Sequence, residues 1–302
     1  MRIFVTGATG FIGRALVARL LEASYEVVAW VRDVDRAAKA LGDGPSFVST
    51  AAPDQALTEA IDGCDAVVNL AGSPVIGRRW TRAVREALVT SRVDLTRRVL
   101  EAIGPEGPRV VISSSAVGYY GDRGDEALTE ESAPGDDFLA VLCRDWESAA
   151  LEAAPEGSRV VLIRTGVVLG PGGGALQRML PPFKVNAGGP IGTGRQVMPW
   201  IHLEDMVEVI VTALEDTRYE GPLNATAPQP VTNRVFTQAL GKALGRYAVV
   251  PVPAFVLRGL FGEAAEVILA SQRAIPAALE GWGFPFRHPE IQGALDDLVG
   301  EG

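Results

Sequence analysis

The chain has 302 residues, 47% of them hydrophobic, and a formal net charge of −9. This hydrophobic content is ordinary for a globular protein and excludes fibrous and disordered chains, while the excess of acid disfavours nucleic acid or an anionic membrane as the main partner. With only two cysteines, Cys64 and Cys143, and no apolar run near the roughly 20 residues that span a bilayer, we expect neither a disulfide framework nor a membrane span.

The first element is a strand that ends in a glycine turn, in the segment MRIFVTGATGFIG. A run rich in β-branched residues predicts a buried strand, and a helix begins near Phe11. Gly7, Gly10 and Gly13 follow the spacing G-x-x-G-x-x-G. Such a turn exposes backbone N–H groups and the positive end of the helix dipole, which bind a pyrophosphate. The alternative, an ordinary turn with incidental glycines, is disfavoured by the strand–turn–helix context. Because Met1 leads directly into this strand, we expect no signal peptide and a cytoplasmic protein.

Strands and helices then alternate through the first half of the chain. Further buried strands are predicted at 26–31, 47–48, 65–70, 109–112 and 160–164. Helices are predicted at 11–23, 53–62, 81–103 and 138–153. Continuous apolar strands separated by helices indicate an α/β fold, a Rossmann-type doubly wound parallel sheet covered on both faces. Ligands of such a sheet bind beyond the carboxyl ends of its strands.

The second half is richer in loops. Glycine and proline crowd into 170–199, interrupted by a helix at 175–184, and such a stretch inside a compact domain is typical of a functional region. More helices are predicted at 204–215, 232–244, 254–261 and 263–271. We therefore expect a dinucleotide-binding Rossmann core over 1–166, a substrate lobe interleaved with the remaining core elements over 167–249, and a helical C-terminal extension over 250–302.

The residue after the second strand bears on which dinucleotide is bound. NAD-binding sheets of this kind place an acidic residue about 20 positions beyond the glycines. Here Val31 and Arg32 stand at that place. A guanidinium can contact the 2′-phosphate of the adenosine ribose, so NADP(H) is favoured over NAD(H). Two alternatives stay open: Arg32 is a solvated surface residue, or the adjacent Asp33 restores NAD binding.

Several segments carry a family resemblance. The segments TGATGFIG, NLAG and SSSA resemble the extended short-chain dehydrogenases/reductases. Four longer segments, RVVISSSAVGYYGD, RTGVVLGPGGGAL, GGPIGTGRQVMPWIHLEDM and LNATAPQPVTN, are similar to "epimerase family" proteins, atypical members of that superfamily with a C-terminal domain of unknown function. Residues 250–297 resemble that C-terminal domain. The resemblance covers essentially the whole chain and implies a nicotinamide dinucleotide as cofactor, whereas the chemistry of the family is poorly defined.

The resemblance also implies the residues of the cofactor site. It places the glycine turn around the pyrophosphate, through Gly7, Thr9, Gly10, Phe11, Ile12 and Gly13. It brings the segment after the fourth strand close to the cofactor sugar, through Leu70, Ala71 and Gly72. Arg92, on the long helix, approaches the dinucleotide, and Thr165 and Gly166 border its nicotinamide end. For Arg92 the alternative is a solvated helix face, like that of its neighbouring arginines.

One departure from the superfamily pattern concerns the mechanism. Ordinary members carry Tyr-x-x-x-Lys on the helix after the fifth strand, where the tyrosine exchanges a proton with the substrate and the lysine holds the nicotinamide ribose and lowers the tyrosine pKa. Aligning the downstream glutamate of that pattern on Glu147 puts Leu139 in the place of the tyrosine and Cys143 in the place of the lysine. The dyad is therefore absent from its helix.

Three interpretations follow. In the first, hydride chemistry persists with replacement groups: Ser114 or Ser115 acts as hydrogen-bond donor, and Tyr119 or Tyr120 acts as proton carrier. The alternative is that the serines are satisfied strand-end hydroxyls and the tyrosines are packed aromatics. Without the lysine a tyrosine keeps a pKa near 10, poorly matched to neutral pH. In the second interpretation, Cys143 is a reactive thiol; its alternative role is that of a buried packing residue among apolar neighbours. In the third, the protein binds NADP(H) without turning it over.

The remaining polar candidates lie in the second half. Arg195 and Gln196, in a glycine-rich loop, are expected to contact substrate, and the alternative is an exposed loop arginine. His202 precedes a helix with an acidic first turn, which favours a structural role over acid–base work. With His288 as the only other histidine, we expect no metal site.

Together these observations predict an NADP(H)-binding oxidoreductase or nucleotide-sugar-epimerase-like protein. Its substrate is an unassigned small molecule, a nucleotide sugar or a carbonyl compound, and we expect no nucleic-acid or membrane partner. By analogy with the superfamily, a homodimer is compatible with the sequence. The alternative function is a non-catalytic NADP(H)-binding regulatory or assembly protein.

Overall fold

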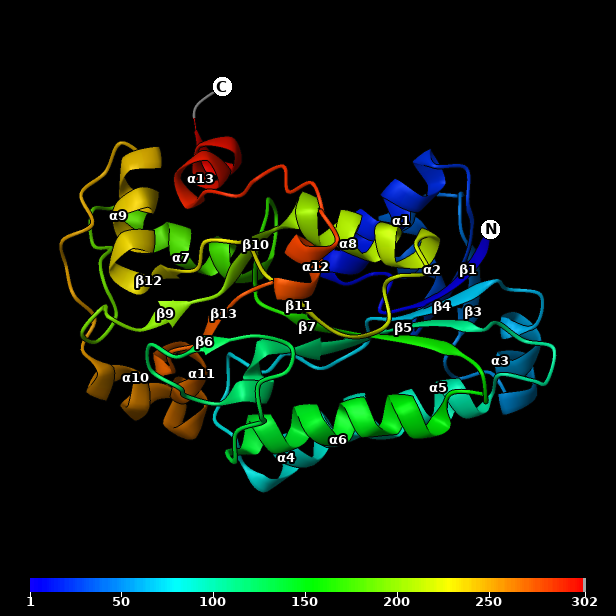
Figure 1. Ribbon diagram of the computed structural model, residues 1–302. Helices are drawn as coiled ribbons and strands as arrows, with labels where there is room; N and C mark the ends of the chain where they lie inside the picture. The colour runs from blue at the N-terminus through cyan, green and yellow to red at the C-terminus, as the bar shows by residue number, and fades with distance from the viewer. Residues whose placement is uncertain (301–302) are drawn as a thin grey trace.

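The computed structural model describes residues 1–300 and centres on one seven-stranded parallel sheet (Figure 1). Its strands run in the order β11-β7-β5-β4-β1-β2-β3. Their bounds are β1 Arg2–Thr6, β2 Glu26–Val31, β3 Ser46–Ser49, β4 Ala66–Asn69, β5 Val110–Ala116, β7 Arg159–Thr165 and β11 Gly221–Ala225. The chain starts in the middle of the sheet and moves outward first to one edge and then to the other, so the strand order reverses between β1 and β4. The predicted doubly wound α/β fold is confirmed.

Helices cover both faces of the sheet (Figure 1). One layer holds α1 Phe11–Glu22, α2 Val34–Leu41 and α8 Leu203–Glu215, and the other holds α3 Asp54–Ile61, α4 Arg82–Val89, α5 Leu95–Glu101 and α6 Phe138–Ala153. Strand side chains alternate between the layers, as a pleated backbone requires. Ile3 and Val5 of β1 join one buried apolar cluster, whereas Phe4 joins the other. This two-sided burial fixes the strand register and therefore the positions of the strand ends.

The helix expected over 81–103 differs from the prediction in one respect. The structure divides it into α4, a π-helical turn at Thr90–Asp94, and α5. A single π turn accommodates one extra residue within a helix and rotates the side chains around it, and such turns occur frequently at functional sites. Here the turn buries Arg92.

Short strand pairs and two further helices build the lobe beside the sheet. β8 Val167–Leu169 pairs with β10 Trp200–His202, and β9 Val197–Met198 pairs with β12 Val231–Thr232. The pairs flank α7 Gly174–Lys184 and α9 Asn233–Ala243. Buried aromatic side chains of Trp200 and Phe236 join these elements into a core of their own. None of these four short strands was predicted from the sequence.

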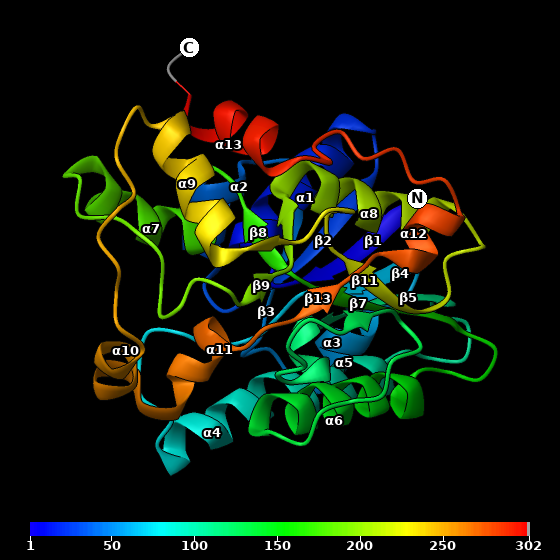
Figure 2. The ribbon, with the colours of Figure 1, turned by 60° about the vertical axis from the view of Figure 1, so that its left-hand side comes forward.

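The C-terminal segment returns to the core in several places (Figure 2). It comprises α10 Ala254–Phe261, a 3-10 turn at Gly262–Ala265, α11 Glu266–Leu269, β13 Arg273–Ala274, α12 Ala277–Gly281 and α13 Ile291–Val299. β13 pairs with β6 Ala127–Leu128, which follows the 3-10 turn at Val117–Tyr120. The buried Asp205 carboxylate of α8 accepts hydrogen bonds from the backbone N–H groups of Arg287 and His288, at 2.8 and 3.0 Å. No helix within residues 1–300 is both long and apolar enough to cross a membrane.

Candidate functional site

The glycine turn between β1 and α1 permits very close backbone approach. Gly7 has a φ of +68°, and a Cβ there would lie 2.7 Å from the carbonyl carbon of Leu70. A Cβ on Gly13 would lie 2.2 Å from the carbonyl oxygen of Gly7. Any larger residue at either position would force the turn open. These two glycines therefore hold the turn, the start of α1 and the end of β4 together.

The amino end of α1 is open to a ligand. Gly10 is its N-cap residue, no side chain caps the helix, and its first turn has no acidic residue. By contrast, α2 and α6 begin with aspartates whose carboxylates accept backbone N–H groups of the first turn. Thr9 and Gly10 are exposed, and Phe11 and Ile12 are half-buried. The uncapped N–H groups and the helix dipole suit a phosphate. These residues thus fit the dinucleotide that the sequence implies.

A buried hydrogen-bond chain fixes the neighbouring strand end. The Thr6 hydroxyl donates to Asn69 Oδ1 at 2.6 Å and accepts from the N–H groups of Leu70 and Ala71, both at 3.1 Å. The Asn69 amide in turn donates to Thr96 Oγ1 at 2.7 Å. Leu70 and Ala71 are thereby held against the glycine turn. Our sequence reasoning missed Thr6, Asn69 and Thr96, although a polar residue closing an otherwise apolar strand was an available signal.

Arg32 lies at the exposed end of β2. It makes no ion pair with any residue in 1–300. The adjacent Asp33 is the N-cap of α2, where its carboxylate accepts from the N–H of Arg36 at 3.0 Å. One carboxylate oxygen of Asp33 is therefore engaged in capping, while the Arg32 guanidinium stays available beside it.

Arg92 is buried, contrary to the alternative of a solvated helix face. Arg92 is only 9% exposed, and its guanidinium donates a hydrogen bond to the backbone carbonyl oxygen of Ser73 at 2.8 Å. The guanidinium carbon lies 5.3 Å from the ring centroid of Trp146, a cation–π distance. A Cβ on the exposed Gly72 would lie 3.2 Å from that same carbon. Arg92 is therefore enclosed between the loop after β4 and helix α6.

The predicted catalytic residues meet in a second buried network. Arg164 donates from Nε and Nη2 to the two carboxylate oxygens of Glu147, at 2.9 and 2.8 Å. The Ser115 hydroxyl donates to the same carboxylate at 2.6 Å. Arg164 also donates to the Tyr120 hydroxyl at 3.0 Å, and that hydroxyl donates to Asn224 Oδ1 at 2.7 Å. Burial lowers the pKa of Arg164, but the hydrogen bonds and charge of Glu147 outweigh this effect and the net shift is upward.

The two tyrosines of this network differ in accessibility. Tyr120 is fully buried, and burial raises the pKa of its hydroxyl to about 12. Its engaged hydroxyl is therefore a poor proton carrier at neutral pH. Tyr119 is half-buried, its ring centroid lies 3.5 Å from the Arg164 guanidinium carbon, and its hydroxyl has no hydrogen-bond partner within residues 1–300. Of the two predicted proton carriers, the geometry favours Tyr119.

The remaining candidates near the sheet edge are positioned as follows. Cys143 is a free, buried thiol, and burial raises its pKa to about 12, so it stays protonated and unreactive at neutral pH. Ser114 is half-buried on the opposite face of β5 from Ser115. Thr165 and Gly166 are half-buried where β7 ends. These two residues lie at the carboxyl edge, where a ligand of the sheet is expected.

The predicted substrate residues lie on a separate loop. Arg195 is exposed and makes no side-chain hydrogen bond within the described chain. Gln196 is half-buried, and its amide donates to the carbonyl oxygen of Ile191 at 3.1 Å. The backbone carbonyl oxygen of Gln196 accepts a hydrogen bond from the backbone N–H of Asn233 at 2.9 Å. Gln196 thus stabilises the loop, whereas Arg195 is free to meet a ligand.

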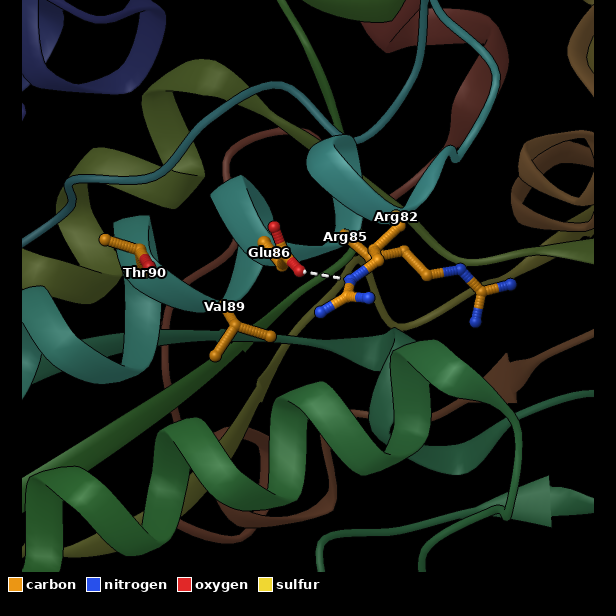
Figure 3. A pocket seen from close by; sticks show the side chains of 5 residues that line it. All are labelled: Arg82, Arg85, Glu86, Val89 and Thr90. Atoms are coloured by element: carbon orange, nitrogen blue, oxygen red, sulfur yellow. Dashed lines mark hydrogen bonds and ion pairs between the residues drawn. The ribbon is translucent and has the colours of Figure 1, made fainter.

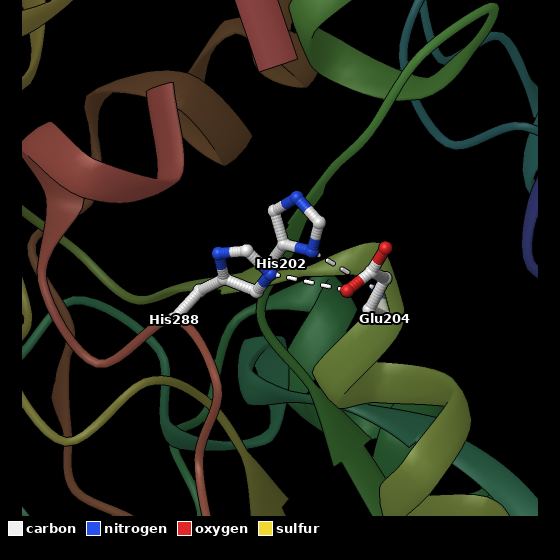
Figure 4. Close-up of side chains that lie close together, drawn as sticks. All are labelled: His202, Glu204 and His288. Atoms are coloured by element: carbon white, nitrogen blue, oxygen red, sulfur yellow. Dashed lines mark hydrogen bonds and ion pairs between the residues drawn. The ribbon is translucent and has the colours of Figure 1, made fainter. Parts of the chain in front are cut away.

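His202 caps α8 and stacks on His288, with ring centroids 3.7 Å apart (Figure 4). Together with Glu204 the two rings form a cluster whose nitrogen and oxygen atoms lie within 4.8 Å of one another, a spacing that a metal could bridge. However, His202 Nδ1 accepts from the N–H of Glu204 at 3.1 Å, which places the ring proton on Nε2, 3.3 Å from Asp297 Oδ2. Neither nitrogen then offers a free lone pair to a metal. The capping hydrogen bond at Nδ1 favours a structural role for His202.

Two hollows open on the surface away from the glycine turn. One, of about 530 Å³, runs along α4 and is lined by Arg82, Arg85, Glu86, Val89 and Thr90 (Figure 3). The other, of about 370 Å³, lies between α1, α8 and α13 and includes His202. Neither is lined by the residues of the glycine turn or by Arg92. The candidate site consists of the glycine turn and the residues at the carboxyl ends of the strands, and these two hollows are not lined by them.

Comparison with known proteins identifies the family. The model of the NAD dependent epimerase/dehydratase family matches residues 3–224. The chain belongs to this family. A second model, a domain of unknown function (DUF1731), matches residues 252–298, the C-terminal segment predicted from the sequence.

Relatives of this family member align over nearly the whole chain. The epimerase family protein Mb2239 of Mycobacterium bovis is 43% identical over 294 residues, which cover 97% of this chain and 96% of the relative. The crystal structure of the human epimerase family protein SDR39U1 with NADPH has a TM-score of 0.89 and 36% identity, covering 99% of both chains. The structure of the nucleoside-diphosphate sugar epimerase from Corynebacterium glutamicum has a TM-score of 0.78 and 37% identity, covering 99% of this chain and 58% of that chain.

Proposed function

We propose that this epimerase-family chain binds NADP(H) at the carboxyl edge of the sheet, with the pyrophosphate at the amino end of α1. The observation that carries the proposal is the glycine turn, where Gly7 and Gly13 exclude any side chain and α1 begins without a cap. Backbone N–H groups are thereby left for the phosphate oxygens. The human relative whose structure contains NADPH, similar over 99% of both chains, supports the same cofactor.

Arg32 accounts for a preference for NADP(H) over NAD(H). Its exposed guanidinium stands where β2 ends, and Asp33 is engaged in capping α2. A charge-assisted hydrogen bond contributes roughly 1.5–3 kcal/mol, or about 10- to 150-fold in affinity. We therefore expect Arg32→Ala to weaken NADPH binding by that factor and to leave NADH binding nearly unchanged. Arg82→Ala is the matched control, since the Arg82 side chain is 93% exposed on α4.

The proposed activity is oxidoreduction or epimerisation of a small molecule, either a carbonyl compound or a nucleotide sugar. When bound, NADP(H) supplies or accepts the hydride. Tyr119 offers a half-buried hydroxyl with no partner within residues 1–300 to carry the proton. Ser115, held by Glu147, offers its oxygen lone pairs as acceptors near the strand end. Arg195, exposed in its loop, suits a phosphate of the substrate.

A second candidate function is NADP(H) binding without turnover. It is favoured by the engagement of the Ser115 and Tyr120 hydroxyls, which donate to Glu147 and Asn224 instead of facing a ligand. A panel of carbonyl compounds and nucleotide sugars, assayed with stereospecifically deuterated NADPH, separates the two functions. Stereospecific transfer of deuterium that Tyr119→Phe slows at least 100-fold supports the enzyme. Tight NADPH binding without transfer to any compound supports the binder.

A further inference from the structure

Part of the C-terminal segment is fastened to the rest of the protein at its two ends. At the first anchor, the backbone N–H of Val252 donates to the carbonyl oxygen of Pro190 at 2.9 Å. At the second anchor, the N–H of Ser271 donates to Asp122 Oδ1 at 3.1 Å, and β13 pairs with β6. Residues 253–270, which form α10, the 3-10 turn and α11, span the distance between these two anchors.

Between the anchors the segment buries little apolar surface. Within residues 253–270 only Ala264 and Ala265 are buried, and both side chains are small. Helix α10 buries no residue, and its Phe255 and Leu260 are 75% and 61% exposed. A segment with few buried apolar contacts opens locally before the rest of a protein unfolds. Its closed position therefore depends largely on polar contacts.

Two arginines supply these contacts from outside the segment, where α10 and α11 lie beside α4 (Figure 2). Arg79, in the loop before α4, donates from Nε to the carbonyl oxygen of Leu260 at 3.1 Å and from Nη2 to that of Gly259. These carbonyls belong to the last turn of α10, where a helix leaves its C=O groups without partners of its own. Arg85 of α4 forms an ion pair with Glu263 in the 3-10 turn.

The two anchors lie beside the two places where we propose substrate contacts. The first anchor belongs to the glycine-rich loop that carries Arg195. The second anchor adjoins the turn that carries Tyr119, because the Gln272 amide donates to the carbonyl oxygen of Gly121 at 3.0 Å. Residues 253–270 thus run from the Arg195 loop to the Tyr119 turn.

We propose that residues 253–270 form a lid over the substrate side of the site, and that Arg79 and Arg85 form the latch that holds it closed. Opening breaks the contacts of the latch and swings the lid about its two anchors, which admits a small molecule. Closing excludes water from the hydroxyl of Tyr119. The proposal rests on the proposed function for the site that the lid covers. The lid and its latch belong to the free protein, so both can be tested without cofactor or substrate.

Hydrogen exchange measured by mass spectrometry on the full chain tests the latch. We expect Arg79→Met/Arg85→Met to raise exchange in residues 254–269 about tenfold, because hydrogen bonds to a charged group and an ion pair are lost together, while exchange in β13 stays as in the wild type. The matched control is Arg78→Met, since Arg78 is exposed and makes no side-chain hydrogen bond or ion pair within the described chain. Arg85→Glu alone should raise exchange in the lid, and adding Glu263→Arg should reverse most of that rise.

Nitration by tetranitromethane tests what the lid covers. Tyr119 is half-buried, whereas Tyr247, outside the lid, is 78% exposed and serves as the internal control. We expect Arg79→Met/Arg85→Met to speed nitration of Tyr119 about fivefold and to leave that of Tyr247 unchanged.

Three results would overturn the proposal. Unchanged exchange in residues 254–269, or an equal rise in the lid and in β13, would show that Arg79 and Arg85 hold no separate lid closed. Unchanged nitration of Tyr119 in a variant with an open lid would show that the lid does not cover the site. If the wild type fails to bind NADPH in calorimetry, the proposed function fails, and the exchange and nitration measurements still decide whether the lid exists.

Discussion

The ion pair between Arg164 and Glu147 gives a sharp prediction about stability. Their side chains are 4% and 8% exposed, so Glu147→Gln leaves a buried guanidinium without its counter-charge. Removing one partner of a buried pair costs about 3–5 kcal/mol, and we expect the lower end because the glutamine amide oxygen still accepts one hydrogen bond. With an unfolding entropy of roughly 2.1 cal/mol/K per residue, a loss of about 3 kcal/mol lowers Tm by about 5 °C in a chain of this length.

Urea unfolding followed by circular dichroism measures this loss. The matched control is Glu86→Gln, which breaks the exposed Arg82–Glu86 pair of 2.7 Å and should cost under about 0.5 kcal/mol. The double variant Glu147→Leu/Arg164→Met removes both charges and should recover part of the stability lost in Glu147→Gln. A Glu147→Gln loss no larger than the control, or a double variant less stable than Glu147→Gln, would refute the reasoning.

Two further predictions concern the glycine turn and His202. Gly13→Ala should abolish NADPH binding measured by calorimetry, because the alanine Cβ would lie 2.2 Å from the Gly7 carbonyl oxygen. The control is Gly293→Ala in α13, where a Cβ meets nothing within 4 Å, and it should leave NADPH binding unchanged. Burial, reinforced by the charge of His288, lowers the pKa of His202 below 6.5. Just below that pH, His202 therefore binds a proton in the unfolded chain but not in the native chain. The free energy of unfolding should therefore fall by up to about 1.4 kcal/mol per pH unit as pH drops below 6.5, and urea titrations of His202→Asn, which keeps the cap, should lack this slope. An unchanged slope in that variant would show that other groups dominate.

The regular elements were predictable because their signals are local. Helix α6 runs over Phe138–Ala153, the bounds predicted from the sequence, and β2 also has the expected bounds. The three pairs of short strands carry no such signal, since strands of two or three residues form only when distant segments meet. β6 and β13, for example, pair Ala127 with Arg273. Periodicity likewise concealed the π turn, which inserts one residue into an otherwise continuous helical pattern.

The candidate site was predictable in part. The glycine motif located the turn, and the structure places Leu70 and Ala71 beside it through hydrogen bonds to Thr6. The buried networks were harder to predict, because their partners come from different elements. Glu147 served only as an alignment marker, although its charge on an apolar helix face, and that of Arg164 at the end of an apolar strand, were available signals.

The central claim is that the glycine turn and Arg32 form an NADP(H) site. Parallel calorimetric titrations of the wild-type protein with NADPH and NADH test it most directly. The account predicts one site per chain with NADPH bound at least tenfold more tightly than NADH. Equal affinity for the two dinucleotides would contradict the role of Arg32, and binding of neither would contradict the site itself.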